Sequence, residues 1–344
     1  MRISPYVVFL FHMILINSSA VEFSTFIVGK WLTYLCVDYA RIDHINHTSS
    51  EIKIEVNSNQ FFIELNGYKF DFSKFKNSNS SYWYRRAAHI SYTSFQTPPD
   101  VTNPAIIKDG VNKELLTLNS FLLDSFYVAS KYKINHHSKS NLNRLVTFKM
   151  ALNCGLKIPA FVITNRKQNV INFSAIHKKI VIKPISEVVT IDVKEKLYTQ
   201  YTRVLKHNEL DKLPDNFFPS LFMQYIEKSY EVRSFYLDGK FYSMAMFTQQ
   251  RKQTVDDFRR YEYTNPVRVV PYKISEVIEE KIRHLFSDLN INSGSIDLLK
   301  PQDGSELVFL EINPVGQFGM VSHPCNYYLE KLIAQNLSNK KNEG

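Results

Sequence analysis

The chain has 344 residues, of which 44% are hydrophobic and 22% are charged, and its formal net charge is +9. These values are ordinary for a globular protein and give enough chain for about two domains. A positive balance suits nucleic acid, an acidic membrane surface, a nucleotide or an acidic peptide. Because the basic residues are scattered and form no nucleic-acid-binding signature, we expect neither nucleic acid nor a membrane as a partner.

The three cysteines, Cys36, Cys154 and Cys325, are far apart and form no CxxC pair. This pattern disfavours a disulfide framework or a zinc–cysteine site and fits a reducing compartment. The first 20 residues imitate a secretory signal peptide, with a basic start, an apolar run over 6–16 and a small-residue end. The alternative, which we favour, is that Met13 is the true initiator, residues 1–12 are a mis-assigned start and residues 13–16 form a first strand.

The amino-terminal part, to about residue 135, is predicted to be an α/β domain. Its apolar spacing predicts helices over 23–39 and 113–132, and strands over 51–56, 60–72 and 82–86. The last of these strands ends in Arg85 and Arg86, which we interpret as a solvated strand end in preference to a substrate site. His136 and His137 begin a linker and, because adjacent side chains project differently, are not expected to bind a metal.

The next part combines a helix over 141–155 with strands over 160–164 and 180–183. Lys183 is borne on an apolar strand, where a lysine is more often functional because burying an unpaired ammonium is costly. Residues 186–196 contain no glycine, so a phosphate-binding flap cannot be placed there.

Further strands are predicted over 219–228, 231–233 and 241–247, followed by helices over 274–289 and 325–337 and a frayed tail over 338–344. Between them, residues 249–272 form a loop-like basic segment that contains Arg259, Arg260 and Arg268. Such a loop is usually solvated surface. By its position in the chain it could instead receive an acidic substrate.

Residues 295–313 read as two short strands joined by a turn at 301–304. Asp297 then lies opposite Leu310 or Glu311, depending on a slip of one residue. The second register places Asp297, Glu311 and Asn313 on one face, and it places four apolar residues on the other: Ile296, Leu298, Leu310 and Ile312. Crowded carboxylates with an amide oxygen suit Mg²⁺. The spacing alone leaves open a hairpin with one exposed carboxylate on each strand.

The order of Asp297 and the Glu311-x-Asn313-Pro sequence resembles the metal-binding end of the ATP-grasp superfamily. The phrases VIKP, SLFMQYIEKSYEVRSFYLDGKFYSMAMFTQ, DDFRRY, SGSIDLL and FLEINPVGQFGMVS resemble more narrowly the graspetide maturases, relatives of the microviridin ligases. The resemblance covers about residues 140–337 strongly and the amino-terminal domain more loosely.

The resemblance implies an ATP-grasp fold of the α/β (α+β) class: a pre-ATP-grasp domain over 1–135, a central lobe over 136–215, and a metal-binding lobe over 216–337 with antiparallel sheets. It assigns ATP contacts to Arg144, Lys183, Glu231 and the segment Gln224, Tyr225 and Ile226, and catalytic roles to Lys183, Arg233 and Arg259. It assigns Mg²⁺ to Asp297, Glu311 and Asn313. The family commonly has a lysine where Arg144 stands, and the two side chains are not interchangeable.

The implied activity is an ATP-dependent, ADP-forming ligation in the cytoplasm. Asp or Glu side chains of a ribosomal precursor peptide, made of leader and core, are activated as acyl phosphates. Ser, Thr or Lys side chains of the same peptide then close ester or amide rings. A homodimer is compatible with this. Two other hypotheses stay open: a ligase that adds a free amino acid to a protein or peptide carboxylate, and a non-catalytic nucleotide-binding module.

Overall fold

The computed structural model describes residues 14–19, 21–42, 52–58, 60–65, 68–72, 80–87, 102–186, 190–193, 196–199, 202–248 and 267–338. The chain divides into two compact units, one of residues 1–140 and 328–344 and the other of residues 141–327. The finer division at residues 135, 215 and 337 stays a prediction. Among the helices described, none is both long enough and apolar enough to span a bilayer.

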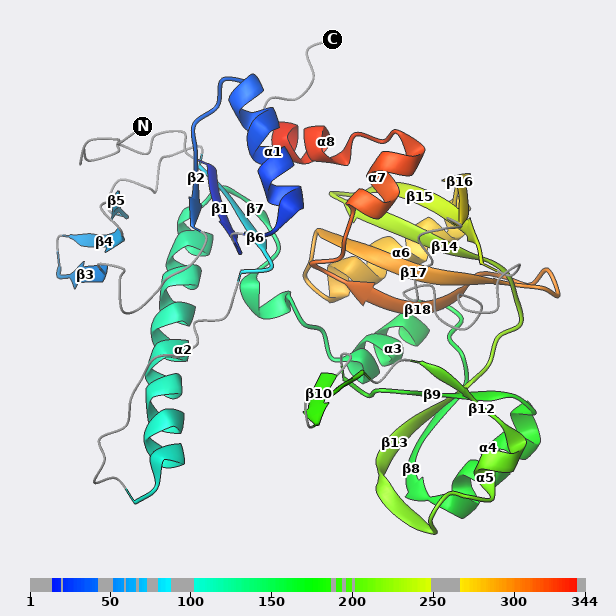
Figure 1. The fold of residues 1–344 in the computed structure, drawn as a ribbon. Coiled ribbons are helices and arrows are strands. Elements are labelled where there is room, and N and C mark those ends of the chain that lie inside the picture. The colour runs from blue at the N-terminus through cyan, green and yellow to red at the C-terminus, as the bar shows by residue number, and fades with distance from the viewer. Residues whose placement is uncertain are drawn as a thin grey trace. The chain divides into compact units, whose positions relative to one another are not determined.

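The first unit is built on a parallel sheet of order β2-β1-β6-β7 (Figure 1). Its strands are β1 (Ile14–Ser18), β2 (Tyr39–Ile42), β6 (Ser81–Arg85) and β7 (Tyr132–Ile134). Every residue of β1 and β6 is buried, as is usual in a parallel sheet covered on both faces. The α-helices among the described residues of this unit are α1 (Phe23–Tyr34), α2 (Pro104–Ala129) and α8 (Leu329–Leu337).

A small antiparallel sheet of β3 (Ile52–Val56), β4 (Phe61–Leu65) and β5 (Tyr68–Asp71) completes the unit. Helix α2 begins nine residues before its predicted start, because Asn103 caps it by accepting a hydrogen bond from the Ala105 N–H at 3.2 Å. The interpretation of Arg85 as a solvated strand end is wrong: its side chain is 3% exposed and lies 3.7 Å from the Glu22 carboxylate.

Among the described residues, the second unit contains two larger antiparallel sheets and one two-stranded hairpin. The first has the order β12-β9-β13-β8 and carries α4 (Lys167–His177) and α5 (His207–Leu210) around a small core that includes Val170, Ile180 and Phe222. Its strands are β8 (Phe161–Arg166), β9 (Ile180–Lys183), β12 (Arg203–Leu205) and β13 (Asn216–Gln224). A hairpin of β10 (Thr190–Val193) and β11 (Lys196–Thr199) occupies much of the glycine-free stretch.

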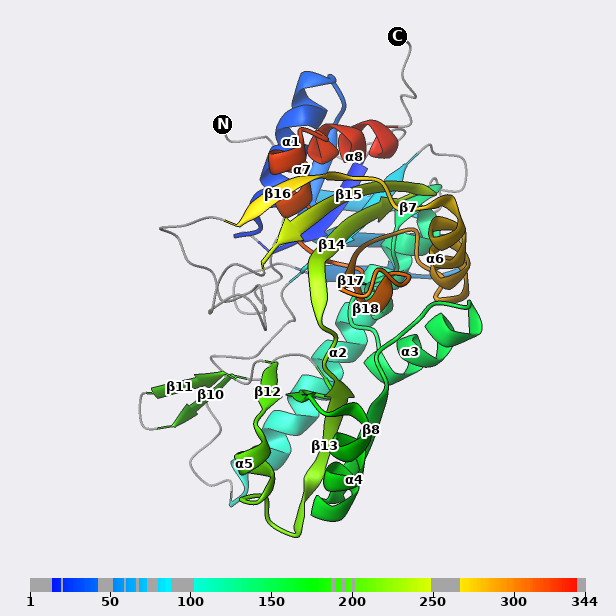
Figure 2. The ribbon, with the colours of Figure 1, turned by 90° about the vertical axis from the view of Figure 1, so that its right-hand side faces the viewer.

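The other sheet has the order β16-β15-β14-β17-β18. Its strands are β14 (Lys228–Leu237), β15 (Lys240–Phe247), β16 (Arg268–Tyr272), β17 (Ser293–Pro301) and β18 (Val308–Asn313). Helices α3 (Arg144–Asn153) and α6 (Glu276–Asp288) share its main core, which includes Phe148, Ile282, Phe286, Ile296 and Phe309. Strand β13 of the first sheet leads directly into β14 of this one, so that residues 225–227 connect the two sheets (Figure 2).

Two predictions about the carboxy-terminal half are wrong in part. Arg268 does not lie in a loop: it begins the edge strand β16, and its guanidinium lies 5.3 Å from the centre of the Phe247 ring. The closing helix predicted over 325–337 begins four residues later, because α8 starts at Leu329; a separate helix that was not predicted, α7 (Gly319–Cys325), precedes it, with left-handed residues at Asn326 and Tyr328 between the two. Arg259 and Arg260 lie outside the described residues. All three cysteines are free thiols, as predicted.

Candidate active site

The β17–β18 hairpin has the second of the two predicted registers. Asp297 pairs with Glu311, and Ser295 pairs with Asn313. Since side chains alternate along a strand, Asp297, Glu311 and Asn313 project from the same face of the sheet.

One apolar assignment in this hairpin is wrong. The register shifts directly after Asp297, so that Leu298 pairs with Phe309 and Leu310 becomes the extra residue of a β-bulge. Phe309 therefore takes the core position expected for Leu310 and is fully buried, whereas Leu310 lines the pocket beside Glu311.

Asp297 lies at the centre of this face, where it is poorly solvated. Its Oδ1 is buried and accepts no hydrogen bond within the described part of the chain. Its cationic neighbour is Arg233 on β14, whose Nη1 lies 3.5 Å from that oxygen. Burial raises the pKa of Asp297 to about 6, Arg233 acts in the opposite direction, and the nearby carboxylates of Glu311 and Glu231 raise it further. A carboxylate so placed is suited to a cation.

Glu311 is held by two cations from different elements. Lys183 at the end of β9 approaches its Oε2 at 2.8 Å, and Arg144 at the first turn of α3 approaches the same oxygen at 3.5 Å. Arg144 also donates hydrogen bonds to the main-chain carbonyls of Pro184, Ile185 and Ser186. The side chain expected to contact phosphate thus also fixes the segment that follows Lys183.

Glu231 is buried on β14 and has a cationic partner that the sequence did not indicate. The Lys228 ammonium lies 2.6 Å from its Oε1, and the Thr248 hydroxyl donates to the same atom at 3.1 Å. Residues three apart in a regular strand face opposite sides, so this pair could not be inferred from spacing. A register shift between Lys228 and Tyr230 brings both side chains to one face.

A pocket between the two sheets of this unit collects these residues. Lys183, Lys228, Glu231, Asp297 and Glu311 line it, and so does the whole predicted adenine segment of Gln224, Tyr225 and Ile226. Apolar side chains supply much of its remaining wall: Pro159, Val181, Met223, Leu299 and Leu310.

The adenine segment is fixed by main-chain hydrogen bonds. The Gln224 N–H donates to the Ala160 carbonyl at 2.8 Å, and the Tyr225 N–H donates to the Lys179 carbonyl at 3.0 Å. Lys179 also lies over the Tyr225 ring, with its Nζ 3.6 Å from the ring centre. Since those two amides are engaged within the protein, the groups of this segment that can meet a ligand are its carbonyls and the amide of Ile226.

The structure therefore brings together ten of the eleven residues predicted for the site. Nine of them line the pocket or contact Glu311 or Asp297, and Asn313 shares their face, where its Oδ1 accepts a hydrogen bond from the Val315 N–H at 3.1 Å. Arg259 lies outside the described residues.

No family model matches the sequence, and no curated protein matches it. Solved structures do match over nearly the whole chain. The macrocyclase MdnC of Microcystis aeruginosa, bound to the precursor peptide MdnA, is 22% identical, with 95% of this chain and 99% of MdnC covered and a TM-score of 0.75. A RiPP-associated ATP-grasp ligase of Chryseobacterium gregarium, in complex with ADP and a leader and core peptide, is 21% identical, with 96% and 97% covered and a TM-score of 0.78.

The ATP-grasp ligase PsnB, complexed with a precursor variant, Mg and ADP, is 16% identical, with 95% and 97% covered and a TM-score of 0.72. TM-scores from 0.72 to 0.78 over nearly the whole chain establish the fold, and identities of 16–22% extend no further than the fold. The chain has the ATP-grasp fold, as the sequence predicted.

Proposed function

We propose that this protein is an ATP-dependent ligase that joins side-chain carboxylates of a peptide to side-chain hydroxyls or amines of the same peptide. The observation that carries the proposal is the row of Asp297, Glu311 and Asn313 on one sheet face, with Lys183 and Arg233 within ion-pair distance of its two carboxylates. The pocket that this row borders also contains Glu231 and the segment 224–226, which suits a nucleotide.

The residues present fit Mg²⁺. Asp297 has a buried oxygen that accepts no hydrogen bond from any described residue, two further carboxylates raise its pKa, and Asn313 adds a neutral oxygen on the same face. Hard oxygen donors of this kind are those that Mg²⁺ uses together with phosphate oxygens. When bound, the ion would neutralise negative charge on the transferring phosphoryl group.

We assign the nucleotide contacts on the same basis. Lys183 and Arg144 would contact phosphates, Glu231 the ribose hydroxyls, and the segment 224–226 the adenine. An ammonium has three donors, so Lys183 can keep its hydrogen bond to Glu311 while it donates to a phosphate oxygen. Lys228 holds the Glu231 carboxylate in place by the contact at 2.6 Å.

The reaction that these groups support is phosphoryl transfer from ATP to an Asp or Glu side chain, followed by displacement of phosphate by a Ser or Thr hydroxyl or a Lys amine. The substrate carries both reacting groups, so the protein needs to position them and to offset charge. Arg233 and Arg259 are the guanidiniums that we assign to the activated carboxylate. The structures of MdnC, the Chryseobacterium ligase and PsnB with peptides favour a ribosomal precursor peptide as substrate.

The decisive experiment combines the protein with ATP, Mg²⁺ and a synthetic Thr- and Asp/Glu-rich precursor peptide encoded near its gene. The expected product is lighter by one water for each bond formed, with one ADP released for each bond. A product heavier by an amino-acid residue would favour the rival ligase, and nucleotide binding without ADP release would favour a binding module. Asp297→Asn is the negative control, and the exposed-turn variant Asp303→Asn is the matched positive control on the same hairpin.

A further inference from the structure

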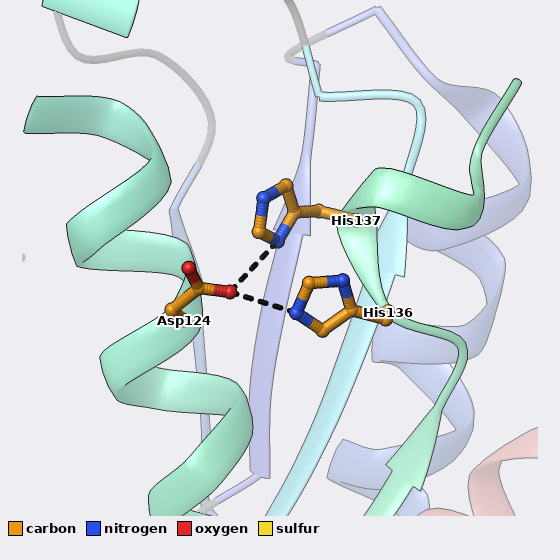
Figure 3. A group of neighbouring side chains, drawn as sticks. All are labelled: Asp124, His136 and His137. Atoms are coloured by element: carbon orange, nitrogen blue, oxygen red, sulfur yellow. Dashed lines mark hydrogen bonds and ion pairs between the residues drawn. The ribbon is translucent and has the colours of Figure 1, made fainter. Parts of the chain in front are cut away.

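A second group of polar side chains lies in the other unit, on the parallel sheet. Asp124 projects from α2, and His136 and His137 lie at the start of the short 3₁₀ turn η2 (His137–Lys139), just after β7. His136 Nε2 lies 2.7 Å and His137 Nδ1 lies 3.6 Å from the same carboxylate oxygen, Oδ1 of Asp124 (Figure 3). One ligand atom from each residue thus lies within 4.8 Å of the other two.

The local backbone explains why two adjacent histidines can face one carboxylate. In an extended strand their side chains would point to opposite sides. Here Asn135 has a left-handed conformation, with φ of 52°, and the chain enters the 3₁₀ turn at His137. Both rings consequently turn toward α2 and lie 4.3 Å apart, measured between ring centres. The expectation that the two adjacent side chains point in different directions is therefore wrong.

Buried polar atoms without hydrogen bonds gather on the same face of the sheet. Within the described part of the chain, His137 Nδ1, Asn17 Oδ1 and the Tyr82 hydroxyl are such atoms. Asn17 pairs in register with Tyr84, whose ring centre lies 6.2 Å from that of His137. The Tyr82 ring packs edge-on against Tyr127 of α2. Because buried polar atoms are nearly always satisfied, these three atoms need a partner other than the side chains in the described part of the chain.

We propose that Asp124, His136 and His137 form a binding site for a divalent first-row transition metal ion such as Zn²⁺. Two imidazoles and one carboxylate are the donor set that such ions share, whereas Mg²⁺ prefers oxygen ligands. Ligand atoms about 2.0–2.1 Å from a tetrahedral ion lie roughly 3.3 Å apart. The observed distances of 2.7 and 3.6 Å from Asp124 Oδ1 lie on either side of that value.

The surroundings of the three ligands suit metal binding. The Ser138 hydroxyl lies 2.7 Å from His136 Nδ1 and can accept the proton that this nitrogen carries once Nε2 binds a metal. The Ser120 hydroxyl donates to the other Asp124 oxygen at 3.4 Å.

The competing explanation is a hydrogen-bonded Asp–His pair with no ion. It requires the proton on His136 Nε2, and the Ser138 N–H at 3.2 Å from Nδ1 would support that tautomer. In that case His137 Nδ1 forms no hydrogen bond with Asp124, because their separation of 3.6 Å is too long for one. A bound metal ion would account for the positions of both His137 Nδ1 and His136 Nε2 near Asp124. This proposal does not depend on the proposed ligase activity.

The test uses the full-length protein after treatment with a chelator. Zn²⁺ is titrated by calorimetry, and Co²⁺ is titrated as a spectroscopic substitute. With excess Mg²⁺ present to fill the proposed site at Asp297, we expect one Zn²⁺ per chain and an affinity more than about tenfold lower in both Asp124→Asn and His137→Gln. His284→Gln is the matched control, because His284 lies 3.3 Å from a glutamate on an exposed helix face. Affinities equal to the wild type in both site variants would overturn the proposal.

A measurement on the unaltered protein guards against variants that fail to fold. X-ray absorption at the zinc edge should show two imidazole nitrogens and no sulfur. Sulfur in the first shell would assign the ion to one of the free cysteines, and fewer than two imidazoles would assign it elsewhere. Either result, or the absence of binding, would leave the Asp124 group as a hydrogen-bonded pair alone.

Discussion

Asp297→Asn should stabilise the protein while it abolishes activity. The pKa of Asp297 is raised from its ordinary value of 3.8 to about 6, chiefly because burial disfavours the charged form. The folded state therefore holds this proton more tightly than the unfolded state does. Stability from this group is fully present below pH 3.8 and is lost as the pH rises through 6, because an ionised Asp297 costs free energy in the fold.

The size of the effect follows from the pKa. One pKa unit corresponds to 1.36 kcal/mol, so the ionised carboxylate destabilises the fold by about 3 kcal/mol above pH 7. The attraction of Arg233 is already included, since both protonation states are compared beside the same guanidinium. The asparagine has no charge and nearly the same shape. We expect the variant to exceed the wild type by about 2–3 kcal/mol at pH 8 and by about half as much at pH 5, and to approach it below pH 3.8.

Hydrogen exchange read by mass spectrometry suits this comparison, because the chain has two compact units and need not unfold in one step. Peptides from β14 and β17 report the opening free energy around Asp297 at pH 5 and pH 8, without Mg²⁺ or nucleotide. Asp303→Asn is the control, and its effect on stability at pH 8 should have the opposite sign. Hydrogen bonds from Ser305 lower the pKa of that exposed carboxyl, so its charged form stabilises the fold. A variant no more stable than the wild type at pH 8 would refute the reasoning about Asp297.

Three further changes test the site. Under the proposed function, Lys183→Met should slow ADP formation about 10²–10³-fold, because it removes a donor to the developing phosphoryl charge. Lys113→Met, in an exposed ion pair with Asp109, should have little effect in a coupled ADP assay. Under the proposed assignment, Glu231→Gln should raise the KM for ATP about tenfold or more with a smaller change in kcat, because it would weaken a charged hydrogen bond to the ribose. Gly316→Ala should weaken Mg²⁺ binding measured by calorimetry, because the added Cβ would lie 2.5 Å from the Ser295 side chain and 3.0 Å from the Asn313 carbonyl. The control is Gly110→Ala, whose Cβ meets nothing within 4 Å, and it should leave Mg²⁺ binding unchanged.

The hairpin that carries the carboxylates could be predicted because every local signal agreed. Its residues alternate with a period of two, and its turn contains Gly304, whose φ of 77° favours glycine. The choice between two registers could not be made from spacing. The bulge at Leu310 could not be predicted either, because the position of an extra residue depends on which of Phe309 and Leu310 fits the core formed with α3 and α6.

Other parts were missed because they depend on contacts between segments far apart in the sequence. Lys228 joins the site only through a strand irregularity, and Arg85 is buried because a parallel sheet needs cover on both faces. The two histidines face Asp124 only because Asn135 adopts a left-handed conformation, which alternation along a strand does not reveal.

The charges around the pocket indicate that the proposed reaction needs further cationic side chains. Four cationic side chains of the described site, those of Arg144, Lys183, Lys228 and Arg233, face the three carboxylates of Glu231, Asp297 and Glu311. These charges nearly balance. If Mg²⁺ and ATP bind together, the net charge of the site becomes negative, because the negative charge of the triphosphate exceeds the positive charge of the ion. A peptide carboxylate would then approach a site of its own sign, which costs free energy in a poorly solvated pocket. Under the proposed function, we therefore expect additional guanidiniums on the peptide side of the site, and the basic sequence segment that contains Arg259 and Arg260 is our candidate for them.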